Sequence, residues 1–68
     1  MPSNYAEAES LYQQSLAISE KTFGPEHPDV ATTLANYAAV LRKTGRDYLA
    51  TKMEARAKAI RARHAQDN

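Results

Sequence analysis

An internal repeat limits what this chain folds into. The segment 5–18, YAEAESLYQQSLAI, returns in degenerate form 42 positions later, at 47–60. The two copies align residues of similar character, namely Ala8 with Ala50, Leu11 with Met53, Ser15 with Ala57, Ala17 with Ala59 and Ile18 with Ile60. A repeat of this length, written in helix-forming residues, is typical of an α-solenoid, whose units bury their apolar faces against their neighbours. The repeat therefore favours a surface that holds other molecules over one that converts them.

The length of the chain limits the size of its core. Its 68 residues form one small domain. A chain this short buries only about 60% of the surface that its unfolded form exposes, so its core needs a supplement. The absence of cysteine excludes disulfides and thiolate metal sites. Because His27 and His64 are too far apart to form a metal site by spacing, we expect no metal and no cofactor. The supplement to the core is then expected to come from self-association or from neighbouring repeats.

The chain has neither an apolar run near the ~18 residues of a membrane span nor a signal-peptide pattern. We therefore expect a cytoplasmic protein with no membrane contact. Its charge is unevenly distributed: residues 1–41 carry five acids and one base, a net −4, whereas residues 42–68 carry eight bases and three acids, a net +5. The chain is predicted to be electrically bipolar.

The pattern of apolar residues predicts three antiparallel helices, at about 4–23, 28–44 and 47–64, followed by a frayed tail over 65–68. Ser3 or Asn4 is expected to cap the first helix, and Gly24 and Gly45 to end the first two. The first helix has a stripe of apolar or small residues, and the tyrosines are expected in the core with their hydroxyls at its rim. The predicted stripe and tyrosines are Tyr5, Ala8, Leu11, Tyr12, Ser15, Ile18, Tyr37 and Tyr48. The core as a whole is predicted to comprise Leu11, Ile18, Leu34, Tyr37, Leu41, Met53 and Ile60.

The second and third predicted helices resemble a tetratricopeptide repeat. In the pattern W-x2-L-G-x2-Y…A-x3-F, Leu34, Tyr37, Ala38 and Leu41 fit the first helix, and Ala50 fits the alanine of the second. The segment Ala8-x3-Tyr12 fits the second half of a preceding repeat. The 42-residue period and the stretch 23–31, FGPEHPDVA, resemble the kinesin-light-chain-like variant. The resemblance implies an all-α fold, a three-helix antiparallel α-solenoid fragment of one and a half repeats over residues 4–64.

The departures from the repeat predict how each end of the solenoid is finished. In the third helix, Lys58 replaces the apolar Leu16 and Glu54 replaces Tyr12, as expected of a terminal repeat that faces water. Residues 46–64 are therefore predicted to be a C-terminal cap. On the N-terminal side no cap precedes the first helix, so we expect self-association through an uncovered edge, the acidic side of one copy against the basic side of another. The residues predicted for this edge are Leu11, Tyr12, Leu16 and Ile18.

The resemblance also implies a partner-binding face, because the first helix of each repeat lines the concave side of the solenoid. The residues in this register are Thr32, Ala35, Asn36, Ala39, Arg42 and Lys43. Asn36 is expected to bond the backbone of an extended protein or peptide, and Arg42 and Lys43 to engage an acidic partner. The alternative is structural: a solvated Asn36, and two cations that complement the end of the helix.

Two other sequence patterns bear on function. Glu26, His27 and Asp29 bracket Pro28 at a helix start, and since neither a third ligand nor a nucleophile accompanies them, we predict no catalytic site and no enzyme. The basic third helix offers an alternative function, nucleic-acid binding through Arg46, Lys52, Arg56 and Arg63. Glu54 interrupts that set and no aromatic residue interleaves it. The sequence thus favours a scaffold for protein–protein interaction, a homo-oligomer or a fragment of a longer array, with Met1-Pro2-Ser3 as either a cut end or a native start.

Overall fold

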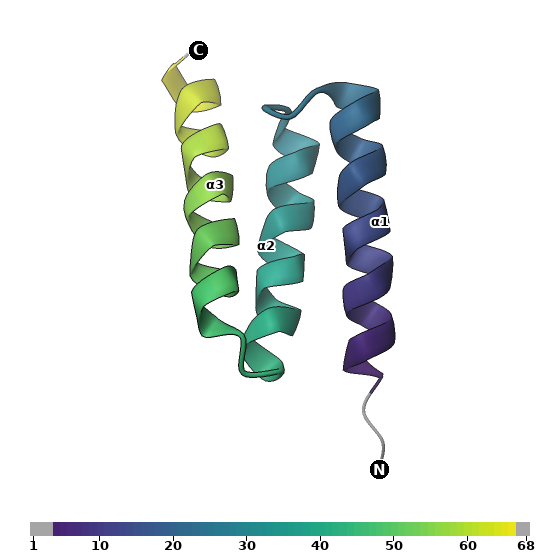
Figure 1. Ribbon diagram of the computed structural model, residues 1–68. Coiled ribbons are helices and arrows are strands. Elements are labelled where there is room, and N and C mark those ends of the chain that lie inside the picture. Colours follow the sequence, from purple (N-terminus) through teal and green to yellow (C-terminus); the bar gives the residue numbers. More distant parts are fainter. Residues whose placement is uncertain (1–3, 67–68) are drawn as a thin grey trace.

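The computed structural model describes residues 4–66 and contains three helices that stand antiparallel in one row (Figure 1). Helix α1 spans Tyr5–Phe23, α2 spans Pro28–Lys43 and α3 spans Asp47–Gln66. Helix α2 lies in the middle and packs against both of its neighbours, whereas the backbones of α1 and α3 make no close contact within residues 4–66. The predicted all-α, three-helix antiparallel architecture is confirmed.

Glycine ends both of the first two helices, as the sequence predicts. Gly24 has a φ of 93° and its N–H donates to Glu20 O at 2.9 Å. Gly45 has a φ of 82°, and the N–H of the next residue, Arg46, donates back to Leu41 O at 2.8 Å. A left-handed backbone suits glycine because it has no Cβ to clash with the backbone. These two residues therefore fix the points at which the chain reverses.

The helix starts are only partly as predicted. Asn4 occupies the N-cap position of α1, but its side chain makes no capping hydrogen bond, so Asn4 is not the capping residue; the alternative, Ser3, lies outside the described residues. Its φ of −94° and ψ of 26° differ from the extended conformation in which a capping side chain reaches the first-turn amides. At the start of α2, His27 is the capping residue: its Nδ1 accepts a hydrogen bond from Asp29 N at 3.0 Å, and the first turn begins at Pro28.

The core is centred on α2. Six of the nine buried hydrophobic residues belong to α2 and the other three to α3, which explains why α2 holds both neighbours. Tyr12 and Leu16 of α1 and Met53 of α3 are partly buried against this centre. The buried residues are Val30, Ala31, Leu34, Tyr37, Ala38 and Leu41 from α2 and Ala50, Ala57 and Ile60 from α3.

Three residues predicted in the buried stripe of α1, Leu11, Ser15 and Ile18, are instead exposed. The exposed fraction is 59% for Leu11 and 64% for Ile18. The reason is that α1 has a neighbour on one side only, and its contact face is the one that carries Tyr12 and Leu16. Tyr48 is also misplaced in the prediction, since it is 76% exposed on a side of α3 that does not face α2.

Helix α3 runs past the predicted end at His64 and continues through Gln66. Of the predicted frayed tail, Ala65 and Gln66 are therefore helical, while 67–68 lie outside the described residues. Neither glycine nor proline follows Asp47 in the chain, and alanine is the strongest helix former, so no local signal stops the helix at His64.

Candidate protein-interaction surfaces

The predicted partner-binding residues lie on the side of α2 opposite its buried face, hereafter the α2 outer face. Asn36, Ala39 and Lys43 are exposed, as is Thr32, whose hydroxyl donates to Pro28 O at 3.4 Å. Ala35 is half-buried. Within residues 4–66, the side chains of Asn36 and Lys43 make no hydrogen bond or ion pair, which leaves their donors directed to solvent. A short polar strip of α2 is thus available for contact.

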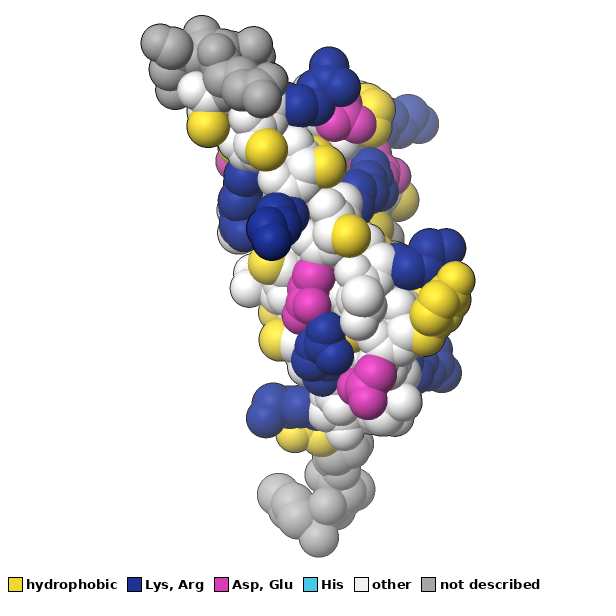
Figure 2. All heavy atoms as spheres, turned by 90° about the vertical axis from the view of Figure 1, so that its left-hand side faces the viewer, with side chains coloured by type: hydrophobic (Ala, Val, Ile, Leu, Met, Phe, Trp, Pro, Cys, Tyr) yellow, Lys and Arg dark blue, Asp and Glu magenta, His cyan; other side chains and the backbone are white. Residues whose placement is uncertain are grey.

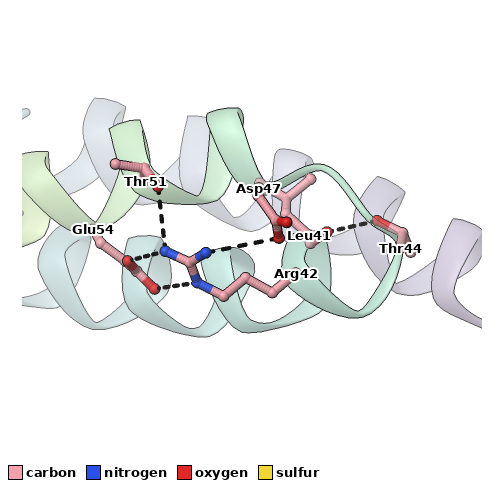
Figure 3. A network of polar contacts seen from close by, with 6 residues as sticks. All are labelled: Leu41, Arg42, Thr44, Asp47, Thr51 and Glu54. Atoms are coloured by element: carbon pink, nitrogen blue, oxygen red, sulfur yellow. Dashed lines mark hydrogen bonds and ion pairs between the residues drawn. The ribbon is translucent and has the colours of Figure 1, made fainter.

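Arg42, predicted to engage a partner, is bound within the chain (Figure 3). Its guanidinium donates two hydrogen bonds to the carboxylate of Glu54 of α3, with Nε–Oε2 at 3.0 Å and Nη2–Oε1 at 2.5 Å. Nη2 also donates to Thr51 Oγ1 at 3.3 Å, and Nη1 lies 3.7 Å from Asp47 Oδ1. Hydrogen bonds from Arg42 lower the pKa of the Glu54 carboxyl, and Glu54 in turn raises the pKa of Arg42. Arg42 therefore joins α2 to α3.

Three of the four bases weighed above for nucleic-acid binding, Arg46, Lys52 and Arg56, also contact other residues of the chain. Arg46, before α3, contacts Glu9 of α1 at 3.2 Å, and Arg56 contacts Glu20 of α1 at 2.5 Å. Lys52 lies over the Tyr48 ring, 5.6 Å from its centroid. The view onto α3 shows basic side chains spread along the helix and separated by carboxylates and apolar groups (Figure 2).

The two α1 contacts change the interpretation of the bipolar charge. Glu9 is only 9% exposed, so its carboxylate is largely removed from water and needs the cation of Arg46 beside it. Acids of the N-terminal half thus neutralise bases of the C-terminal half inside one chain. Glu9 and Glu20 therefore have cationic partners within the chain, whereas the predicted attraction between copies stays a prediction.

The predicted self-association residues divide into two pairs. Tyr12 and Leu16 face the core, where the Tyr12 ring stacks on Tyr37 with centroids 6.2 Å apart. Leu11 and Ile18 face outward, on the side of α1 away from its contact with α2. We call the exposed surface of Leu11, Gln14, Ser15 and Ile18 the α1 outer face. It places two apolar side chains, Leu11 and Ile18, beside two polar ones, on a side of α1 that no other helix of residues 4–66 covers.

The loop between α1 and α2 contacts the middle and the C-terminal end of α3. Arg56 Nη2 donates to Pro25 O at 3.3 Å, and His64 Nε2 lies 2.9 Å from Glu26 O. His27 stacks on Phe23 with ring centroids 4.6 Å apart, which supports its structural role as a cap. In the described part of the chain no group of three or more His, Cys, Asp or Glu residues could hold a metal ion, and no pocket is found.

Three contacts that shape these surfaces were not identified from the sequence. They are the ion pair of the buried Glu9 with Arg46, the contacts of Arg56 and His64 with backbone oxygens of the α1–α2 loop, and the bidentate contact of Arg42 with Glu54. The separation of acids and bases into opposite halves is a sequence signal for the contact of Glu9 with Arg46 alone, because Arg42 and Glu54 both belong to residues 42–68 and the loop contacts use backbone oxygens. That signal indicates attraction between the halves without saying which residues meet.

The family model described as "Tetratricopeptide repeat" matches residues 3–63, nearly the whole chain. No curated protein and no solved structure matches it. Within residues 4–66, no helix is long and apolar enough to cross a membrane.

Proposed function

Because the chain belongs to the tetratricopeptide repeat family, whose members generally mediate protein–protein interaction, we propose that it is an interaction module whose main binding element is the α1 outer face. The occupant of that face is an amphipathic helix. The spacing of 42 residues between the two copies supports the further proposal that the chain is of the kinesin-light-chain-like variant.

One observation carries the proposal: Ile18 is 64% exposed whereas Ile60, its equivalent in the internal repeat, is 1% exposed. The same holds along the face, since Leu11 is exposed and its equivalent Met53 is partly buried. In α3 these positions are covered by α2. The α1 outer face is thus the apolar half of an interface for which residues 4–66 supply no covering helix.

In the second repeat, α2 covers the equivalent positions of α3, so its residues indicate which side chains would pack on the α1 outer face. The residues of α2 packed against Ala57 and Ile60 are Val30, Ala31 and Leu34, aliphatic side chains with one small residue among them. A helix with that pattern, running antiparallel to α1 as α2 does to α3, presents a complementary ridge. Burying one such aliphatic side chain contributes about 1.5–3 kcal/mol.

A direct test uses a synthetic peptide of residues 27–45, which contains the whole of α2, as the probe. Titrated into the labelled full-length chain at low micromolar concentration, it is expected to shift the amide resonances of α1. Leu11→Gln and Ile18→Gln should each weaken binding about tenfold or more, since each removes one of the two exposed aliphatic anchors.

The matched control is Asn36→Ala, which changes the α2 outer face and should leave peptide binding unaltered. Absence of binding to the unmodified chain at a dilution where it is monomeric, or binding indifferent to Leu11 and Ile18, would reject the α1 outer face as the binding element. Loss of binding in Asn36→Ala alone would instead assign the interaction to the α2 outer face, the second candidate. Asn36 and Lys43 there have unused donors suited to a peptide backbone and a carboxylate.

A further inference from the structure

We propose that the helix which covers the α1 outer face is α1 of a second copy of this chain. The two helices pair antiparallel across a two-fold axis, with Leu11 of each copy against Ile18 of the other. This inference rests on the proposed function, because it names the partner for the same face. Three features of α1 support it: the spacing of its seam, the charges beside the seam and the position of α2.

The seam has the spacing of a coiled-coil contact. Ala8, Leu11, Ser15, Ile18 and Thr22 recur at alternating intervals of three and four residues, so they follow one line along the helix. Leu11 and Ile18 are two turns apart, roughly 10.5 Å at 1.5 Å per residue. If the two-fold axis passes midway between Leu11 and Ile18, the antiparallel pair has two Leu–Ile contacts side by side. The remaining seam positions carry small or polar residues, whose size allows the two helices to approach closely.

The charges flanking the seam favour the antiparallel arrangement. Glu7, Gln14 and Lys21 are seven residues apart, so they lie on one flank, and all three are exposed. In an antiparallel two-fold pair each flank faces the same flank of the other copy. Glu7 therefore meets Lys21 of the second copy twice, once at each end. Neither residue has an ion pair among the described residues, so neither must give up a contact to form this one.

Helix α2 leaves the flank of Glu7 and Lys21 open to the second copy. It packs on the side of α1 that carries Tyr12 and Leu16, the flank opposite Glu7 and Lys21. By the same symmetry, the two α2 helices lie on one side of the antiparallel pair. A parallel pair would oppose Glu7 to the flank of Tyr12 and would therefore lose its contact with Lys21. One helix pair buries less than the roughly 1,200–2,000 Å² of a standard interface, so we expect a reversible dimer in the micromolar range. Its closed symmetry stops assembly at two copies.

The experiment is sedimentation equilibrium of the full chain with a charge swap. The unmodified chain should form a concentration-dependent dimer. Glu7→Lys and Lys21→Glu should each raise the dissociation constant about tenfold, because each replaces two attractions by two repulsions. The double variant should return it to within about threefold of the unmodified value. Both charge reversals are unfavourable for the α1 dipole. Recovery of the dissociation constant in the double variant therefore cannot come from a more stable helix.

The control is Lys58→Glu, an exposed base on α3, which should leave the dissociation constant unchanged. Because the chain has no cysteine, Gln14→Cys can report directly on the axis: this variant should form a disulfide-linked dimer on mild oxidation, whereas Ala62→Cys on α3 should not.

Each contrary outcome has a distinct meaning. A chain that stays monomeric at high micromolar concentration, while the 27–45 peptide still binds, overturns the second copy as partner but leaves the proposed function standing. Species larger than a dimer, or sensitivity to Lys58→Glu without sensitivity to Glu7→Lys, indicates head-to-tail contact of α1 with α3 and also overturns the two-fold pair. Failure of both dimer and peptide binding overturns both proposals.

Discussion

Ile18 and Ile60 provide a matched pair of substitutions that tests the interpretation of the fold. They are the same residue at equivalent positions of the internal repeat, yet Ile18 is 64% exposed and Ile60 is 1% exposed. Replacing a buried isoleucine by alanine costs about 2–5 kcal/mol, because apolar contact is lost and a cavity remains. Ile60 lies near the end of α3, so its surroundings collapse more readily, and we expect the lower part of this range, about 2–3 kcal/mol.

The same change at Ile18 should have almost no effect on the monomer. Exposed positions away from special features change stability by about 0.5 kcal/mol or less. The difference between the two variants is large for a chain of this size, whose total stability is expected at roughly 3–10 kcal/mol from about 0.05–0.15 kcal/mol per residue.

Urea denaturation followed by circular dichroism of the helices measures both variants. With a slope near the low end for small proteins, about 1 kcal/mol/M, Ile60→Ala should lower the midpoint by about 2 M or more. Ile60→Val, expected at about 1 kcal/mol, keeps the comparison measurable if the alanine variant is too unstable to fold. Equal losses for Ile18→Ala and Ile60→Ala, at a dilution where sedimentation shows only monomer, would refute the conclusion that the α1 outer face is uncovered.

Three further predictions follow from the helix ends and the α2–α3 contact. Gly24→Ala should destabilise the chain by about 1–2 kcal/mol in chemical denaturation, because a Cβ opposes its positive φ; no loss would mean that the turn relaxes. His27→Ala should cost about 0.5–2 kcal/mol by removing the cap, whereas Asn4→Ala should cost little, since that side chain caps nothing; equal costs would contradict the capping geometry. The Arg42 contact lowers the pKa of Glu54, so its stabilisation is present above the unfolded pKa and is lost as pH falls through the folded one. Melting temperatures of the unmodified chain and Glu54→Gln should therefore differ at neutral pH and converge in acid, and a difference that persists in acid would contradict this.

The reversals of the chain and the core of α2 were predictable because their determinants are local. Gly24 and Gly45 are the only glycines, and each follows a helical pattern, so their sequence positions alone indicate where the chain turns. Leu34, Tyr37 and Leu41 lie three and four residues apart, and the structure buries all three. Such spacing defines a face within a single helix and needs no knowledge of its neighbours.

The candidate surfaces were harder to predict because they depend on how neighbouring helices are placed. The spacing of Leu11 and Ile18 is equally regular, but which stripe of α1 is covered depends on the side from which α2 approaches. The contacts of Arg46 with Glu9 and of Arg56 with Glu20 join residues more than 30 positions apart. Arg42 has the spacing of an outward cation, but its position beside α3 places it within reach of Glu54.

The contact between Tyr12 and Tyr37 gives the chain a built-in optical reporter. The chain has four tyrosines and no tryptophan, so its intrinsic fluorescence comes from phenol rings alone. Tyr37 is buried, stacks on Tyr12 and accepts a hydrogen bond at its hydroxyl from Gln13 Nε2 at 3.0 Å, and both the stacking and the hydrogen bond are lost if α1 separates from α2. Tyr48, exposed on α3, keeps its surroundings and emits as before. Detachment of α1 alone should therefore change part of the emission, before the remaining helix pair unfolds.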